Sequence, residues 1–236
     1  MEGLSGMRMG LSERRSALVA THREIQDVGL PYVLVGGWAV SAFQARFTTD
    51  VDMVVPQTSL ENYDALLTER SYTKAFDEDV SNIYEGRIVR YEKPVGENTV
   101  EFDALVDALR CRQTDAEWSY RYLEEHSTVE SLDIAEDLSA QIPEPALLFA
   151  LKLHSGRLAD ARDLVVIGAT ADFDRIATHL QRGDQAALAT QIENVLDRLD
   201  SDGFEDSFKG VFQQEGLPTE DIETLTGFLT TQLEEL

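Results

Sequence analysis

Cysteine is almost absent from this chain of 236 residues, and long apolar runs are missing altogether. The single cysteine, Cys111, excludes a disulfide framework and any metal site built from cysteines. No stretch approaches the roughly 18 consecutive apolar residues of a membrane-spanning helix. The first ten residues, MEGLSGMRMG, lack the apolar core of a signal peptide. Together these absences predict a cytoplasmic protein without a membrane segment.

Basic residues are also scarce, and lysine most of all. The chain has 44 acidic and 20 basic residues, a formal charge of −24, and only four lysines. Such a charge argues against a broad nucleic-acid-binding face. Many carboxylates with few lysines are typical of a halophilic protein, because at about 1 M salt the Debye length of roughly 3 Å screens the repulsion. An ordinary acidic protein is the alternative.

Hydrophobic periodicity and turn residues predict one helix, then a half rich in strands, then helices only. Helices are expected at 12–28 (with Ser12 as N-cap), 38–46, 58–70, 115–125, 146–151, 172–181, 184–199 (with Asp184 as cap) and 219–236. Strands are expected at 32–35, 51–55, 80–84, 87–93 and 99–106. This order predicts an α+β fold with a mixed β-sheet flanked by helices and a helical C-terminal part.

The most informative stretch is residues 33–55, VLVGGWAVSAFQARFTTDVDMVV. A predicted strand ends at Gly36-Gly37, twelve residues follow, and Asp50 then begins the next strand. Residues i and i+2 of a strand face the same side, so Asp50 and Asp52 project together and offer two carboxylates to a hard divalent cation. Glycines at a strand end let backbone N–H groups approach a phosphate, and a helix starting there adds its positive end.

An acidic pair carries no weight by itself in so acidic a chain. With 44 acidic residues in 236, chance gives about eight acidic-x-acidic triplets, and such charges usually lie on the solvated surface. Asp200 and Asp202 form one of these pairs. The pair at Asp50 and Asp52 differs because apolar residues surround it, and a buried carboxylate is costly unless it is paired or metal-bound.

A third carboxylate is expected from the predicted strand at 99–106. Asp103 and Glu101 share one face of that strand. Three carboxylates can hold two Mg²⁺ ions for an in-line displacement at phosphorus. Glu101 is the rival of Asp103 for this role, and a half-exposed alternating strand without any metal is the other alternative.

The histidines of the chain show no metal-binding spacing. They are His22, His126, His154 and His179. Their wide separation predicts structural or surface roles.

Two blocks of sequence resemble the DNA polymerase β-type nucleotidyltransferase superfamily. The first consists of Gly36-Gly37, Arg46-x-Thr48-x-Asp50-Val51-Asp52 and the later Asp103. The second is Leu147-Leu148-x-x-Leu151-Lys152-Leu153, then Gly156-Arg157, then Ala161-Arg162-Asp163-Leu164. The pattern is most similar to small prokaryotic AbiEii-like (abortive-infection or toxin-type) nucleotidyltransferases, and it covers roughly residues 30–168.

The resemblance implies a minimal nucleotidyltransferase core over 11–168 and a helical C-terminal region over 169–236. Asp50 and Asp52 would bind both metal ions, and Asp103 would bind the catalytic ion and assist deprotonation of the acceptor hydroxyl. The nucleotide-binding residues implied are Gly36, Gly37, Ser41, Arg46 and Asp163. For Arg46, a surface arginine or a structural partner of a carboxylate is the alternative.

Lys152 is implied to point its ammonium group at a phosphate or the acceptor. It is one of only four lysines and lies in an apolar predicted helix, where an unpaired cation is costly. The alternative is a lysine whose head reaches into water. The block departs from the family pattern at Arg162-Asp163, where relatives tend to have Lys-Asp. Arginine keeps the charge but not the compact geometry of lysine.

The implied activity is transfer of a nucleoside monophosphate from an NTP to a hydroxyl acceptor, with two Mg²⁺ ions (Mn²⁺ in their place as an alternative). The acceptor would be an RNA 3′ end, a protein side chain or a small molecule. The resemblance also raises a toxin role with an antitoxin protein as partner. A catalytically silent nucleotide- or partner-binding module of the same fold is the competing hypothesis.

Overall fold

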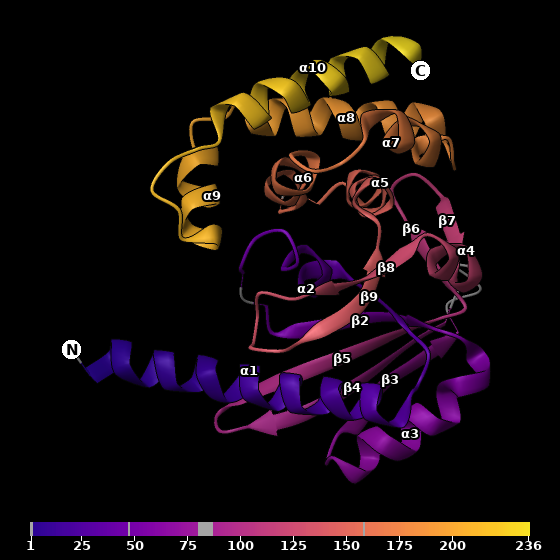
Figure 1. Cartoon of the computed structure of the whole chain (residues 1–236), viewed down its shortest axis with the longest axis vertical. Helices are drawn as coiled ribbons and strands as arrows, with labels where there is room; N and C mark the ends of the chain where they lie inside the picture. The colour runs from indigo at the N-terminus through magenta and orange to yellow at the C-terminus, as the bar shows by residue number, and fades with distance from the viewer. Residues whose placement is uncertain (1, 47, 80–86, 158) are drawn as a thin grey trace.

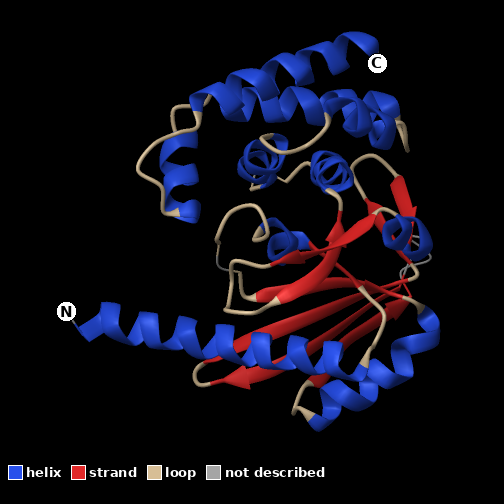
Figure 2. Ribbon diagram, in the orientation of Figure 1, coloured by secondary structure: helices blue, strands red, loops and turns tan. Residues whose placement is uncertain are grey.

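A five-stranded mixed sheet with helices on both sides forms the centre of the protein (Figures 1 and 2). The computed structural model describes residues 2–46, 48–79, 87–157 and 159–236. The strand order is β1-β2-β5-β4-β3, and only β2 and β5 run parallel to each other. The strands are β1 (Val33–Val35), β2 (Asp50–Val55), β3 (Thr73–Asp79), β4 (Arg87–Val95) and β5 (Asn98–Val106).

One face of this sheet packs against two helices, α1 (Glu2–Val28) and α3 (Leu60–Glu69), the latter preceded by the 3₁₀ turn η1 (Gln57–Ser59). Alternate residues of β2 and β5, such as Val51 and Phe102, are buried. Tyr72 meets Phe102 edge-on at 5.5 Å between ring centroids. Alternation therefore leaves the other set of β2 and β5 residues, which includes the aspartates, on the opposite face.

The opposite side of the molecule carries the short helix α2, two hairpins and a layer of helices (Figure 1). These elements are α2 (Gly36–Val40), β6 (Ala108–Cys111), β7 (Ala116–Ser119), α4 (Tyr120–Glu125), β8 (Ser127–Ser131), β9 (Ser139–Pro143), α5 (Pro145–Ser155), α6 (Asp160–Gly168), α7 (Phe173–Leu180), α8 (Gln185–Leu199), α9 (Phe204–Phe212) and α10 (Thr219–Glu235). Helix α5 packs against α6, α7 and α8 and is buried nearly all round. An all-round apolar helix takes such a central place because no face of it gains from water.

The predicted α+β class, the mixed sheet and the helical C-terminal part are confirmed. Asp184 caps α8 as predicted, accepting hydrogen bonds from two backbone N–H groups. Ser12 as an N-cap is wrong, since α1 already begins at Glu2. The predicted strand at 80–84 lies outside the described residues. The boundary between residues 168 and 169 stays a prediction; Phe149 of α5 contacts Phe228 of α10 across it, with ring centroids 6.1 Å apart.

The predicted helix over 115–125 is half wrong. Residues Ala116–Ser119 form β7, and only Tyr120–Glu125 is helical, with Ser119 as N-cap. Ala116 and Trp118 alternate into the core, a period of two that four residues are too short to reveal in the sequence. The short strands β6, β8 and β9 and helix α9 were likewise not predicted.

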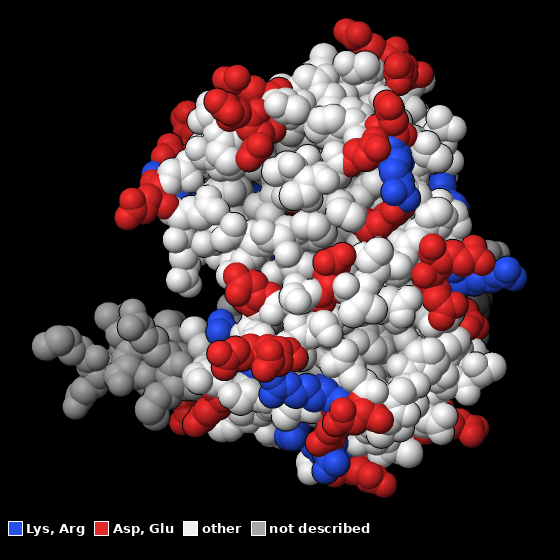
Figure 3. Space-filling model, viewed as in Figure 1, with Lys and Arg blue, Asp and Glu red and all other residues white. Residues whose placement is uncertain are grey.

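The surface is acidic over the visible face. Figure 3 shows acidic side chains in every region of that face, with the fewer basic ones mostly beside them. This agrees with the formal charge of −24. Salt adaptation stays a prediction. Among the described helices, none is long and apolar enough to cross a lipid bilayer.

Candidate active site

The parallel pairing of β2 with β5 places four carboxylates on one face of the sheet. Asp50 lies opposite Glu101, and Asp52 lies opposite Asp103. Paired residues of parallel strands face the same side of the sheet. Because side chains alternate along a strand with a period of two, both pairs lie on the same face. Asp103 is the direct neighbour of Asp52 and is 8% exposed. Of the two rivals for the third carboxylate, Asp103 is therefore the one beside Asp52, and Glu101 lies beside Asp50.

Gly36 lies against Asp52 at the end of β1. Its φ is +65°, and a Cβ atom added there would lie 2.0 Å from Asp52 Oδ2. A Cβ atom on Gly37 would lie 3.2 Å from the Thr48 side chain, whose hydroxyl donates to Asp50 Oδ1. The space that a side chain on Gly36 would fill is thus taken by the Asp52 carboxylate, and the space beside Gly37 is taken by Thr48. Only glycine permits this approach of backbone to carboxylate.

Asp52 carries an uncompensated charge. It is half-buried and makes no hydrogen bond or ion pair with any described residue. Burial, followed by repulsion from Asp50 and Asp103, raises the pKa of Asp52 from 3.8 to about 6, against the opposing effects of Lys152 and Arg157. A carboxylate in this position is the kind of group that a divalent cation stabilises.

Asp103 differs from Asp52 because an arginine from the next strand holds it. Arg90 of β4 donates from Nε to Asp103 Oδ1 at 2.8 Å and from Nη2 to Oδ2 at 2.7 Å. The same guanidinium lies 3.1 Å from Glu101. Bidentate pairs of this kind fix the carboxylate plane. Arg90 was not predicted, because nothing in its own strand marks it; only the β4–β5 register brings it to Asp103.

Removing the charge of Asp52 is expected to stabilise the metal-free protein. Because the pKa of Asp52 is raised on folding, ionised Asp52 costs stability. This cost is absent below about pH 4, grows between about pH 4 and pH 6, and is complete above about pH 6. We expect Asp52→Asn to raise the free energy of unfolding by about 3 kcal/mol at pH 8, and by nothing at pH 4. Urea unfolding in EDTA measures both. A variant less stable than the parent at pH 8 would contradict this electrostatic assignment.

Lys152 lies in a buried network of ion pairs beside the carboxylate cluster. Its Nζ donates to Asp160 at 2.9 Å and to Asp163 at 2.8 Å. Burial alone lowers the pKa of Lys152, but the two carboxylates outweigh it and raise the pKa, so the ammonium stays charged. A lysine with its head in water is therefore excluded. Asp163 also accepts from Arg46, which agrees with the alternative of Arg46 as a structural partner of a carboxylate.

The network balances its own charge. Lys152 and Arg46 face Asp160 and Asp163, and Ser155 donates to Asp160. The four carboxylates on the sheet face, in contrast, have only Arg90 as an ion-pair partner among the described residues. The sheet cluster thus keeps its excess negative charge.

Ser41 does not contribute its hydroxyl to the cleft. The residue is fully buried, and its Oγ donates to the backbone oxygen of Trp38 at 2.6 Å. Asp163, 1% exposed, lies behind Lys152 and Arg46. Direct nucleotide contact by Ser41 or Asp163 stays a prediction; the contacts that the structure gives both residues are internal.

Lys152→Met is expected to destabilise the fold because, among the described residues, it leaves the buried Asp160 without a cation and Asp163 with Arg46 alone. Loss of one partner from a buried pair costs about 3–5 kcal/mol. The matched double change Lys152→Met with Asp160→Asn removes one of the stranded charges, and we expect it to recover part of the loss. Thermal unfolding of both variants tests this. Equal stability of the parent and Lys152→Met would show that the network contributes nothing.

A cleft runs along the sheet face from α5 to β4. Its first part, about 130 Å³, is lined by Gly36, Asp52 and Lys152 among others. Its second part, about 510 Å³, is lined by Asp52, Arg90, Asp103 and the exposed Phe76 among others. Asp52 and Arg157 line both parts. The two parts together have the size at which proteins enclose small ligands, roughly 300–1,000 Å³.

Arg157 lines the cleft, and its guanidinium has no ion-pair partner among the described residues. It is exposed, and its side chain forms no hydrogen bond or ion pair with any described residue. The sequence held a signal for it, since Gly156-Arg157 belongs to the second block. Gly156 has a φ of +60° and ends α5, which turns the chain so that Arg157 faces the cleft.

Comparisons with known proteins give weak structural likeness only. No protein-family model matches the chain, and no curated protein matches it. The protein JHP933 from Helicobacter pylori is 14% identical with a TM-score of 0.45, covering 97% of this chain and 92% of its own. A second H. pylori protein, assigned provisionally as a nucleotidyltransferase, is 14% identical with a TM-score of 0.49, covering 96% of each chain.

A third solved structure is that of the antibiotic-resistance factor ANT(2'')-Ia. It is 11% identical with a TM-score of 0.42, and the overlap covers 95% of each chain. At these identities and scores the likeness establishes neither a family nor an activity for this protein.

Proposed function

We propose that this protein is a metal-dependent nucleotidyltransferase, which moves a nucleoside monophosphate from an NTP to a hydroxyl acceptor and releases pyrophosphate. The observation that carries this proposal is Asp52. Its carboxylate is half-buried, repelled by two neighbouring carboxylates, without a hydrogen-bond partner among the described residues, and in contact with a glycine at a strand end. A fold tolerates such a group where a cation and a phosphate compensate it.

The residues present fit a divalent cation of the magnesium class. Asp50, Asp52 and Asp103 supply only carboxylate oxygens, the donors that Mg²⁺ prefers, and the raised pKa of Asp52 records the charge that an ion would neutralise. Bound there, Mg²⁺ or Mn²⁺ would supply charge neutralisation at the phosphoryl oxygens and lower the pKa of the acceptor hydroxyl.

The chain's own groups would position the substrates. The backbone at Gly36 and Gly37 would approach the triphosphate, because no Cβ atom intervenes. Lys152, kept charged by its two carboxylates, and Arg157 would face the phosphates from the α5 side of the cleft. Asp103 would accept the proton of the acceptor hydroxyl. Arg90 holds its carboxylate plane, which limits the orientations in which it does so.

The larger part of the cleft would take the acceptor. It lies beside Asp103 and combines Arg90 with the exposed Phe76 and the aliphatic Ile88 and Leu105. Its lining therefore combines apolar and charged side chains. It accommodates an acceptor that carries both, and the cleft alone does not select among RNA ends, protein side chains and small molecules.

The test is incubation of the purified protein with each α-³²P-labelled NTP, with Mg²⁺ or Mn²⁺, and with total RNA, a protein lysate or a panel of small polyols. We expect covalent label on one acceptor class, dependent on the cation. RNase, protease and filtration separate the three classes. Binding of NTP without label on any acceptor would contradict transfer and leave the protein a binding module.

A further inference from the structure

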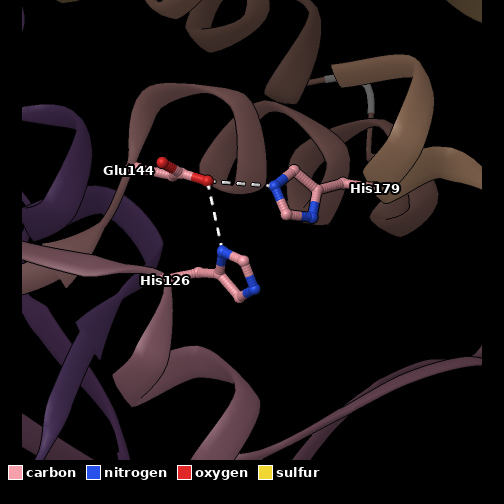
Figure 4. Close-up of side chains that lie close together, drawn as sticks. All are labelled: His126, Glu144 and His179. Atoms are coloured by element: carbon pink, nitrogen blue, oxygen red, sulfur yellow. Dashed lines mark hydrogen bonds and ion pairs between the residues drawn. The ribbon is translucent and has the colours of Figure 1, made fainter. Parts of the chain in front are cut away.

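Two histidines and a glutamate converge at a second place, far along the chain from the aspartates. His126 follows α4, Glu144 precedes α5, and His179 lies in the last turn of α7. Figure 4 shows both imidazole rings directed at one oxygen of Glu144. The three candidate ligand atoms all lie within 4.8 Å of one another. No sequence pattern indicated this cluster, since the wide spacing of the histidines predicted structural or surface roles.

The distances match the edges of a metal coordination shell. His126 Nδ1 lies 3.4 Å and His179 Nε2 lies 3.1 Å from Glu144 Oε1. Ligands about 2.1 Å from a tetrahedral zinc ion are separated from one another by about 3.4 Å. The distance from His126 is long for an N–H···O hydrogen bond, which is usually about 2.7–3.2 Å. The three atoms are therefore near the separation that a shared ion requires.

Neighbouring side chains contact the atoms of His179 and Glu144 that would not bind the ion. Tyr122 Oη lies 2.9 Å from His179 Nδ1. With an ion at Nε2, Nδ1–H would donate to this hydroxyl, an arrangement that orients metal-bound imidazoles in many proteins. Arg175 pairs with Glu144 Oε2, so Oε1 is the oxygen left for both imidazoles.

Access is available on one side only. The side chains of Glu144 and His179 are 12% and 3% exposed, whereas that of His126 is 34% exposed. An ion would enter past His126, and water would complete its coordination there. Two imidazole nitrogens and one carboxylate oxygen suit zinc better than magnesium, which prefers oxygen donors alone.

We propose that His126, Glu144 and His179 form a second metal site, for Zn²⁺ or a similar divalent transition ion, separate from the aspartate cluster. The ion would join α7 to the start of α5 and the end of α4. Helix α5 carries Lys152 and packs on α7. The site would therefore hold the C-terminal helices against the element that positions Lys152.

The convergence of these three side chains can also be explained by hydrogen bonds without a metal ion, and an experiment can tell the two explanations apart. His179 Nε2–H can donate to Glu144 while the Tyr122 hydroxyl donates to Nδ1, and His126 then contributes only its contacts with neighbouring rings. In that case the cluster is a hydrogen-bonded support with no affinity for an ion. Zinc binding that depends on the His126 side chain distinguishes the two, because among the described residues the His126 imidazole makes no hydrogen bond and lies 3.4 Å from Glu144 Oε1.

The test uses the full chain carrying Asp50→Asn and Asp52→Asn, so that ions at the aspartate cluster do not contribute. Zn²⁺ affinity is measured by competition with a chromophoric chelator, and Co²⁺ is added separately for its visible spectrum. We expect one Zn²⁺ per chain and the intense absorption of four-coordinate Co²⁺. Adding His126→Ala should weaken Zn²⁺ at least tenfold and remove that absorption, and Tyr122→Phe should weaken Zn²⁺ by about 10–100-fold.

Glu125→Ala is the matched control, since Glu125 is the exposed neighbour of His126 and, of the residues that the structure describes, pairs only with Arg121. It should leave Zn²⁺ affinity unchanged. Hydrogen exchange along α7 should slow when Zn²⁺ is added to the parent and not when it is added to His126→Ala. Absence of Zn²⁺ binding to the Asp50→Asn, Asp52→Asn chain, or equal affinity with and without His126, would overturn the proposal while leaving the proposed transferase activity untouched.

Discussion

Asp52→Asn is expected to lower nucleotidyl transfer at least about a thousandfold, which corresponds to about 4 kcal/mol in the activation barrier. The amide keeps the size and polarity of the side chain but removes the charge that would bind the cation. The measurement is the rate of label transfer at saturating Mg²⁺ and NTP.

Asp202→Asn is the matched control for this change. Asp202 belongs to an acidic-x-acidic pair of the same form, yet it is exposed and lines neither part of the cleft. We expect it to keep full activity. The same Asp52→Asn protein should also unfold at higher urea than the parent at pH 8, so its loss of activity is not a loss of folding. Undiminished transfer by Asp52→Asn would refute the assignment of the active site.

Gly36→Ala is the second change with a large expected effect, at least about a hundredfold in transfer rate. The new Cβ atom would lie 2.0 Å from Asp52 Oδ2 and 2.9 Å from Asp52 Cγ, so the carboxylate has to move. Displacement of a reacting or ion-binding group by about 1 Å costs on the order of 10²-fold. The alanine also carries the cost of the left-handed backbone, about 1 kcal/mol.

Gly29→Ala separates these two effects. Gly29 has a φ of +73°, close to the +65° of Gly36, but a Cβ atom there would meet nothing within 4 Å. We expect the two variants to lose similar backbone stability in thermal unfolding, and only Gly36→Ala to lose transfer and Mn²⁺ affinity. If both kept full activity, close approach of the backbone at Gly36 would not be part of the mechanism.

Local signals in the sequence were sufficient for the long elements. The periodic pattern of residues 184–199 and its cap Asp184 give α8 at nearly its observed bounds, because a fifteen-residue amphipathic helix depends on its own spacing. The hairpin strands β6 and β7, four residues each, show no such signal. They form because Ala116 and Trp118 find a buried surface that only the rest of the fold supplies.

Some residues of the candidate active site could likewise be found from local sequence patterns, and others could not. Glycine spacing and apolar context singled out Asp50 and Asp52, since a carboxylate on a buried strand is unusual whatever surrounds it. The choice between Asp103 and Glu101 could not be made, because both share one strand face. The register of β2 on β5 placed Asp103 beside Asp52. That register is a long-range pairing, with about fifty residues between the partners, and no local pattern encodes it.

The sequence by itself determined the α+β class, the acidic surface, the strand-end glycines and the aspartate pair, because each depends on composition or on residues a few positions apart. Only the tertiary structure decided that Asp103 lies beside Asp52 and that Arg90 holds Asp103. It also decided that Lys152 forms ion pairs with Asp160 and Asp163. It also brought His126 and His179 together at Glu144. These contacts join separate strands and helices, and their geometry is fixed by the packing of those elements.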